Sequence, residues 1–171
     1  KAQDSMTKES PYLWPHTYKP LIAAVNGYAL AGGWSIAQMC DIRVASEDAK
    51  LGISETKWSL LPPFGTILTK HMPLSAVLEL VLTAQPVTAQ RAYDMGFINK
   101  VVPHDKVLEE ATIFAEQIAE NAPLAVQAFK ELAIRGLDMN IPDISAMTYD
   151  KYDEILKTED SKEGPKAFAE K

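Results

Sequence analysis

The stretch of sequence from Leu21 to Gly33 reads Leu-Ile-Ala-Ala-Val-Asn-Gly-Tyr-Ala-Leu-Ala-Gly-Gly. Its first part, 21–25, is continuously apolar, which is typical of a strand buried on both faces. Asn26 and Gly27 break this strand, and Gly32 and Gly33 open a short helix. Glycine lets another group approach the backbone, and the first N–H groups of a helix carry partial positive charge. The stretch therefore predicts an oxyanion site or, alternatively, no more than a tight strand-to-helix turn.

The sequence that follows predicts an α/β layout. Short strands are expected at 42–45, 51–53 and 97–102, and short helices at 75–82 and 89–95. Thr88 is suited to cap the helix over 89–95, and Gly96 is suited to end it.

The last third of the sequence predicts helices. Asp105 is suited to cap a helix whose apolar residues recur with a period close to 3.6, and further helices begin near Pro123 and Pro142. These helices have little sheet of their own to cover. They are therefore expected to pack on the first half of the chain or on a neighbouring subunit.

Composition restricts the function classes. The 171 residues include 17 Lys and Arg against 23 Asp and Glu, a net charge of −6, which argues against a nucleic-acid partner. No apolar run approaches the roughly 20 residues that cross a bilayer, so no membrane partner is expected. The single cysteine, Cys40, fits a reducing compartment, either cytoplasm or an organelle matrix. His16, His71 and His104 lack metal-ligand spacing, so no metal is predicted.

Several motifs together resemble the crotonase (enoyl-CoA hydratase/isomerase) family. The main one runs from Lys19 through Gly33 to Met39-Cys40-Asp41-Ile42-Arg43-Val44-Ala45-Ser46-Glu47. Further matches follow in the family's order at 51–55, 88–99, 101–103, 121–125 and 159–168. The resemblance, which extends from about Lys19 to the end, implies an α/β fold with a crotonase-like ββα spiral core, followed by a C-terminal helical oligomerisation region.

The resemblance also implies a division of the chain. Residues 1–18 are expected to be a leader or connecting segment, 19–103 the C-terminal part of the crotonase-like core, and 104–171 the helical region. Because the sequence starts at Lys1, we expect it to be the C-terminal, larger part of a longer enzyme. An upstream segment or chain would complete the site, and the assembly would be a homotrimer or a dimer of trimers.

Catalytic roles follow from the resemblance at three positions. Family members bind an acyl-CoA, with coenzyme A as part of the substrate and no separate cofactor, and hold its thioester oxygen between two backbone N–H groups. The N–H of Gly32 would be one donor, and the second would come from upstream. Glu55 matches one of the two acid/base carboxylates of the family's hydratases. Ser35 stands at the position of the other, where a hydroxyl orients water or substrate but is no general base unaided.

Substrate contacts are expected around these residues. Ala31 and Gly33 flank Gly32. Pro63 and Phe64 stand where many relatives have a more glycine-rich loop beside the acyl group. Trp34 lines the acyl cavity or packs in the core, and Lys166 meets the CoA phosphates or is simply solvated.

The function predicted is that of an enoyl-CoA hydratase or isomerase, a lyase or isomerase of fatty acid metabolism. Hydration, dehydration and double-bond shift all proceed through an oxyanion-stabilised enolate, with Glu55 as the acid/base. The alternatives are an acyl-CoA hydrolase or specialised lyase of the same family, or a crotonase-fold binding or assembly protein with little catalysis.

Overall fold

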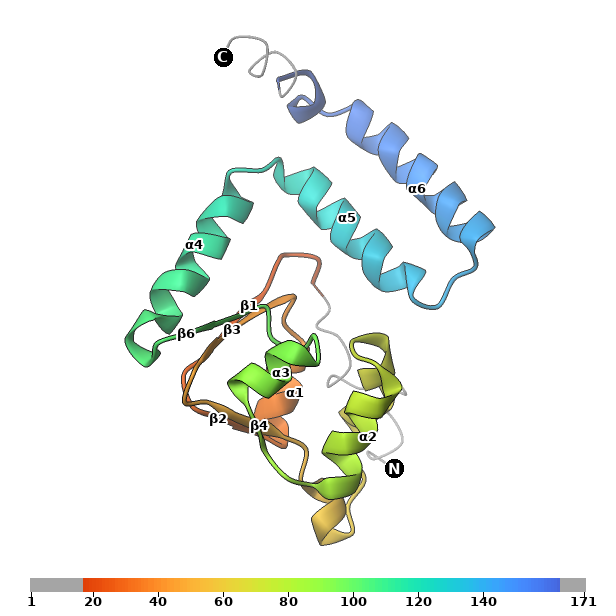
Figure 1. Cartoon of the computed structure of the whole chain (residues 1–171). Coiled ribbons are helices and arrows are strands. Elements are labelled where there is room, and N and C mark those ends of the chain that lie inside the picture. The colour runs from red at the N-terminus through yellow and green to blue at the C-terminus, as the bar shows by residue number, and fades with distance from the viewer. Residues whose placement is uncertain (1–16, 164–171) are drawn as a thin grey trace, which may run out of the picture. The chain divides into compact units, whose positions relative to one another are not determined.

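The computed structural model describes residues 17–163 and divides them into two compact units (Figure 1). The first unit comprises residues 21–114, and the second comprises residues 17–20 together with 115–163. No helix among the described residues is long and apolar enough to cross a bilayer.

The first unit contains two small sheets. One has the order β1-β3-β6, with β1 Ile22–Val25, β3 Ile42–Ser46 and β6 Lys100–Val102, all parallel. The other has the order β2-β4-β5, with β2 Tyr28–Leu30, β4 Lys50–Gly52 and β5 Val87–Thr88; β2 and β4 are parallel, and β5 is antiparallel to β4. Each pass of the chain therefore adds one strand to each sheet, which is a spiral arrangement.

Helices and 3₁₀ segments lie between these strands, and one 3₁₀ segment follows the last of them. They are α1 Gly32–Gln38, η1 Glu55–Trp58, η2 Pro63–Lys70, α2 Leu74–Thr83, α3 Ala89–Asp94 and η3 His104–Lys106. The core between them is built from fully buried residues, including Trp34, Leu51, Ile53, Leu68, Leu80 and Phe97.

The structure confirms the two residues predicted to begin and end helix α3. The Thr88 hydroxyl accepts a hydrogen bond from the Arg91 N–H at 3.1 Å, and Gly96 has a positive φ of 82°. The cap on Thr88 and the left-handed residue after the helix therefore match the sequence prediction.

Three sequence predictions were wrong in detail. Within the described residues, the run 21–25 forms an edge strand, so it is only partly buried and Ala24 is exposed. The predicted strand 97–102 starts only at Lys100, because Phe97 and Ile98 close the turn after α3 through hydrogen bonds to Ala92. Asp105 does not cap a helix; it lies inside η3, whose N-cap is Pro103.

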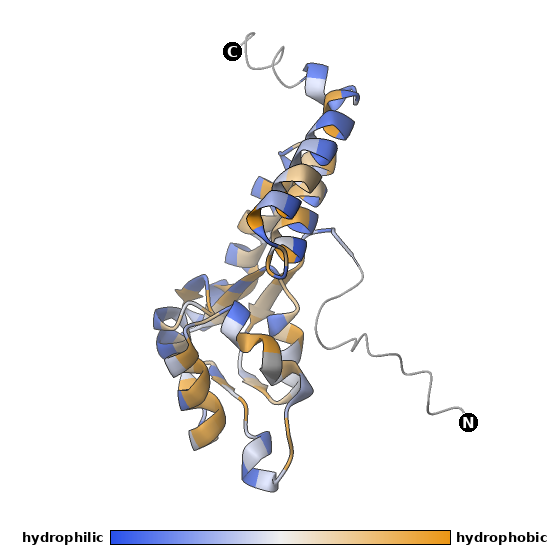
Figure 2. Ribbon diagram, turned by 90° about the vertical axis from the view of Figure 1, so that its right-hand side faces the viewer, coloured by the Kyte–Doolittle hydropathy of each residue, from blue (hydrophilic) through white to orange (hydrophobic). Residues whose placement is uncertain are grey.

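The second unit is helical. It contains the end of α4 Val107–Ala119, then α5 Pro123–Gly136 and α6 Ile141–Leu156. Asn140 caps α6 by accepting from the Asp143 N–H at 3.0 Å, so this helix begins one residue before the predicted Pro142. Apolar and polar residues alternate along these helices (Figure 2), and several large apolar side chains stay exposed, among them Phe129 and Ile141.

Candidate active site

The carboxyl ends of β2 and β4 define the candidate site. The two strands pair in parallel with Leu30 opposite Gly52, and the Ala31 N–H donates to the Gly52 carbonyl at 3.0 Å. Parallel neighbouring strands end at the same edge of a sheet. The segments that begin at Gly32 and at Glu55, two of the predicted catalytic residues, therefore leave the sheet from one edge.

Ala31 makes the turn into α1 with an unusual backbone. Its φ is 50° and its ψ is −117°, a region that residues other than glycine rarely occupy. Such a conformation costs about 1–3 kcal/mol and persists only where the surroundings hold it. Two hydrogen bonds hold it here: the Ala31 N–H donates to Gly52, and its carbonyl accepts from the Ser35 N–H at 3.0 Å. Strain is thus concentrated next to the predicted oxyanion donor.

Gly32 is the first residue of α1, and it is exposed. A Cβ added to Gly32 would meet no atom within 4 Å, whereas one added to Gly33 would lie 3.9 Å from the Tyr28 carbonyl oxygen. Neither residue has a positive φ. Packing within the described chain therefore does not require glycine at position 32, and the space beside its backbone is open.

Ser35 and Glu55 each have a buried polar atom without a partner. Ser35 is 1% exposed, and its Oγ forms no hydrogen bond among the described residues. Glu55, the first residue of η1, is half-buried, and its Oε2 likewise has no partner there. Buried polar atoms are nearly always hydrogen-bonded, and leaving one unpaired costs about 1–3 kcal/mol. These two atoms are therefore available to a water or a ligand.

The other predicted substrate contacts are placed differently. The Trp34 side chain is fully buried and stacks on Phe97, with ring centroids 4.0 Å apart and an interplanar angle of 11°. Phe64 is also in the core at 4% exposure, while Pro63 is exposed. We assign neither aromatic side chain a contact with substrate, because both are packed inside the unit. Lys166 lies outside the described residues.

Two buried polar residues of the first unit, Gln38 on α1 and Arg43 on β3, were missed from sequence. The Gln38 side chain accepts from Trp34 Nε1 at 3.1 Å and donates to the Phe64 carbonyl at 2.9 Å. Arg43, on β3, donates to the carbonyls of Ala37, Cys40 and Phe97, and its guanidinium lies 4.7 Å from the centroid of the Phe97 ring. Arg43 could have been found from sequence, because it is a charged residue within the otherwise apolar run Ile42–Ala45. A charge buried in such a strand must be paired or hydrogen-bonded.

Burial changes the pKa of two groups in this unit. Desolvation lowers the pKa of the Arg43 guanidinium, partly offset by Cys40 and Asp41. Desolvation, together with the positive charge of Arg43, lowers the pKa of His71 to about 4. His71 is therefore neutral near pH 7 in the folded chain.

The stability of the first unit should depend on the protonation of His71. Between pH 6.5 and pH 4 the unfolded histidine binds a proton that the folded one does not, so stability falls as the pH drops through this window. The expected loss is about 2 kcal/mol, which allows for solvent screening of a partly exposed side chain. Urea unfolding at several pH values should show that the free energy of unfolding depends less steeply on pH in His71→Gln than in the wild type. His104→Gln, at an exposed position, should behave like the wild type; equal slopes for all three proteins would contradict the prediction.

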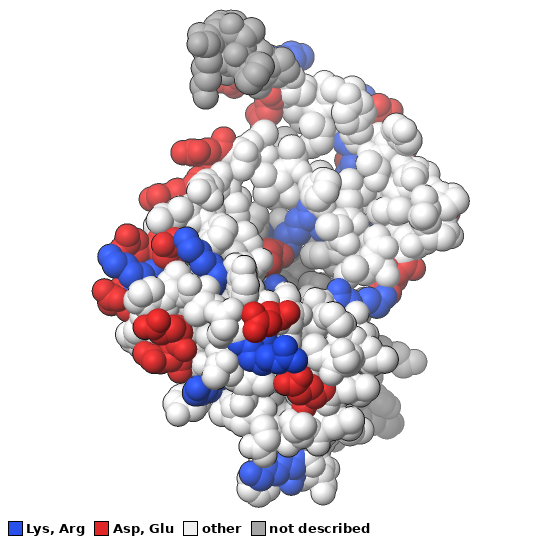
Figure 3. All heavy atoms as spheres, viewed as in Figure 1, with Lys and Arg blue, Asp and Glu red and all other residues white. Residues whose placement is uncertain are grey.

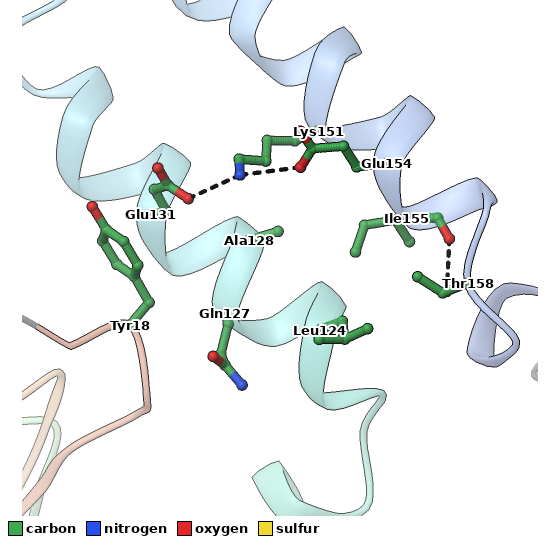
Figure 4. A pocket seen from close by; sticks show the side chains of 9 residues that line it. All are labelled: Tyr18, Leu124, Gln127, Ala128, Glu131, Lys151, Glu154, Ile155 and Thr158. Carbon is green, nitrogen blue, oxygen red and sulfur yellow. Dashed lines mark hydrogen bonds and ion pairs between the residues drawn. The ribbon is translucent and has the colours of Figure 1, made fainter.

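Two cavities of about 280 Å³ each lie elsewhere. One, in the second unit, is lined by residues of α5 and α6 together with Tyr18 and Thr158 (Figure 4). In it the Lys151 ammonium lies between the carboxylates of Glu131 and Glu154, at 3.3 and 3.2 Å. The other lies in the first unit, beside Asn26 and His104. Neither is lined by Gly32, Ser35 or Glu55, so neither cavity is part of the candidate site.

Charged side chains of both signs are interspersed on the face shown in Figure 3. Several form ion pairs, such as Arg91 with Glu79 at 2.6 Å and Lys100 with Glu110 at 2.6 Å. Pairs of this kind at an exposed surface contribute little to stability.

Comparison with known proteins identifies the class. The spiral fold superposes on solved enoyl-CoA hydratases from Mycobacterium tuberculosis and Bacillus anthracis, each with a TM-score of 0.86, at 37% and 35% identity. These matches cover 90% of this chain and 62% and 60% of those structures. The fold is therefore the crotonase fold.

Sequence comparison agrees. The family model described as enoyl-CoA hydratase/isomerase matches residues 2–171. Enoyl-CoA hydratase EchA19 of Mycobacterium tuberculosis is 46% identical over 157 residues, and (E)-benzylidenesuccinyl-CoA hydratase of Thauera aromatica is 39% identical over 161 residues. The match covers 90% and 92% of this chain but 58% and 63% of those relatives. The chain belongs to the enoyl-CoA hydratase/isomerase family.

The family match corrects one prediction from sequence. The resemblance was placed from about Lys19 onward, in the C-terminal part of the chain. The match instead begins at residue 2 and takes in the segment interpreted as a leader.

Proposed function

We propose that this chain binds an enoyl-CoA and adds or removes water at its double bond, with Glu55 as the acid/base. The observation that carries the proposal is the shared edge of β2 and β4. Gly32, with open space beside its backbone, directly follows β2 and Ala31, and Glu55, whose buried Oε2 has no partner among the described residues, follows three residues after β4.

The proposed chemistry uses one carboxylate and one backbone donor. Glu55 removes a proton from a water molecule as the water oxygen bonds to Cβ of the enoyl group. The electrons of the double bond move to the thioester oxygen, where the Gly32 N–H stabilises the developing negative charge. The protonated Glu55 then returns its proton to the enolate at Cα, which restores the carboxylate, and dehydration is the reverse. Coenzyme A is part of the substrate, and the reaction needs no separate cofactor.

The names of the relatives support a reaction that adds or removes water. EchA19 and the Thauera relative are both named as hydratases, and a relative in Clostridium acetobutylicum, 39% identical over 155 residues, is named short-chain-enoyl-CoA hydratase. Ser35 supplies a second buried hydrogen-bonding group, which would orient the water rather than deprotonate it.

Double-bond isomerisation is the second candidate, and Ser35 is the observation that favours it. Moving a double bond needs one base that takes a proton from one carbon and returns it to another. Glu55 alone is sufficient for that, whereas the paired carboxylates of the family's hydratases are reduced here to a carboxylate and a hydroxyl.

The proposed assembly is a homotrimer or a dimer of trimers. Large apolar side chains on α5 and α6 remain exposed, including Phe129 at 74% and Ile141 at 79%, and exposed apolar surface of this kind marks association sites. The second N–H donor to the thioester oxygen would come from a further segment or chain that completes the site. Light scattering of the protein at micromolar concentration tests the assembly, and a monomer would contradict it.

Product analysis distinguishes the two reactions. A panel of enoyl-CoAs would be incubated with the protein in water labelled with deuterium and heavy oxygen, and the products followed by mass spectrometry. Incorporation of one heavy oxygen per turnover supports hydration. Deuterium uptake with a shifted double bond and no oxygen gain supports isomerisation. If no acyl-CoA in the panel reacts, the proposal fails.

Gly32→Ala should separate folding from function. Because the added Cβ meets no atom within 4 Å, the free energy of unfolding should change by less than about 1 kcal/mol. Turnover should fall at least about tenfold, since the methyl group occupies the space beside the proposed N–H donor. Gly27→Ala, which also has open space around the added Cβ, serves as the control and should keep its turnover. Equal turnover in the two variants would contradict the role of Gly32.

A further inference from the structure

The Gln38 amide is a buried polar link between α1, which begins at Gly32, and η2. Gln38 and Trp34 are both 0% exposed, and the core around them is otherwise largely apolar. The Gln38 side chain accepts from Trp34 Nε1 on the same helix and donates to the Phe64 carbonyl at the start of η2. A buried amide is costly unless it is hydrogen-bonded, so this link holds η2 against α1.

The segment between η1 and η2 is fixed at its two ends. At the first end, the Thr56 hydroxyl donates to the Val81 carbonyl at 2.6 Å, and Ser59 ends η1 in a left-handed conformation. At the second end, Gln38 holds Phe64. Between these ends Leu60 and Leu61 are 59% and 87% exposed. The Gln38 hydrogen bond therefore joins this second end to α1, alongside the packing of the buried Phe64 side chain in the core.

We propose that Gln38 is a positioning residue that sets the segment 59–63 against α1 and thereby determines which acyl groups fit beside Gly32 and Glu55. This inference rests on the proposed function, because it assigns the segment to the acyl side of that site. Gln38 acts through the Phe64 backbone and does not contact the reacting atoms.

The two hydrogen bonds of Gln38 have different consequences. Trp34 is also held by its stack on Phe97 at 4.0 Å, so losing the Nε1 hydrogen bond leaves the indole in place. The bond to Phe64 is the one that connects α1 with η2. Trp34→Phe removes the other of the two hydrogen bonds and keeps the link to Phe64, and its smaller ring also leaves space in the core. It is therefore the control for a general loosening of the core.

The experiment compares kcat/KM for short and bulky enoyl-CoAs in the wild type, Gln38→Met and Trp34→Phe, together with hydrogen exchange of residues 59–65. Gln38→Met should change the ratio of kcat/KM between the two substrates by about tenfold, since displacement of a binding segment by an ångström has large kinetic effects. Gln38→Met should also increase the rate of backbone hydrogen exchange in residues 59–65. Trp34→Phe should change both quantities by much less than Gln38→Met, although the smaller ring at a fully buried position should lower the free energy of unfolding.

Gln38→Glu provides a second, rescuable variant. A protonated carboxyl group can accept from Trp34 and donate to Phe64, as the amide does, whereas the carboxylate cannot donate. The ratio of kcat/KM between the short and the bulky substrate should therefore be close to the wild-type ratio at low pH and should differ from it increasingly as the pH rises. If Gln38→Met does not fold, this pH dependence decides the question.

The outcomes separate the two proposals. A wild type that turns over no acyl-CoA overturns the proposed function and, with it, the role of Gln38. A wild type that is active but whose substrate ratio is unchanged in Gln38→Met overturns the positioning role alone. Equal changes in Gln38→Met and Trp34→Phe also overturn it, because they indicate a general loosening of the core.

Discussion

Glu55→Gln is expected to lower the turnover of an enoyl-CoA by about three orders of magnitude, the scale at which a positioned general acid or base contributes. The amide keeps the size of the side chain but cannot take the proton from water or from a substrate carbon. Steady-state kinetics with the substrate that the wild type processes best would measure the effect. Binding of substrate should change much less than kcat.

The matched control for this prediction is Glu47→Gln. Glu47 is an exposed residue directly after β3, so its substitution should leave turnover within about twofold. If Glu55→Gln retains near-normal turnover, Glu55 is not the acid/base, and the orphaned oxygen at that position must be explained by a bound water alone.

Arg43→Met is expected to lower the free energy of unfolding of the first unit by about 3 kcal/mol, because several buried carbonyl groups lose their donor. The guanidinium donates to Ala37, Cys40 and Phe97 and packs over the Phe97 ring. Urea unfolding followed by tryptophan fluorescence suits the measurement, since Trp34 is buried in this unit.

Arg135→Met is the control for the Arg43 prediction. Arg135 pairs with Glu131 at 2.9 Å, four residues away on α5, and its side chain is 52% exposed. Its loss should cost less than about 1 kcal/mol. A cost for Arg43→Met no larger than that of Arg135→Met would show that the buried hydrogen bonds of Arg43 contribute no more than a surface ion pair.

Much of the fold could be predicted from local sequence. The cap at Thr88, the glycine at position 96 and the apolar periods of the later helices gave element types that the structure confirms, because the interactions that fix them span only a few residues. Burial was harder to predict: the apolar run at 21–25 suggested a strand covered on both faces, but its position at the edge of the described sheet depends on which strand pairs with which.

The candidate site was predicted more by resemblance than by physics. The glycines at 32 and 33 indicated an anion site or a simple turn, and only the ordered family motifs singled out Glu55. The packing of Trp34 could not be derived locally, since Phe97 follows it about 60 residues later in the sequence. Gln38 was missed for the same reason: its partner carbonyl belongs to Phe64, in another segment.

The spiral pairing of the strands has a consequence for the order in which the chain folds. β1 pairs with β3 and β2 with β4 across about 20 residues of sequence, whereas β3 pairs with β6 across about 56. Loop-closure entropy makes the longer closure costlier by about 0.9 kcal/mol. We therefore expect the pairing of β2 with β4 to form early. The hydrogen bonds of Arg43 should form late, since its guanidinium donates to the Phe97 carbonyl and its backbone N–H to the Asn99 side chain. A newly synthesised chain would thus pair β2 with β4 before the hydrogen bonds of Arg43 to Phe97 and Asn99 are in place.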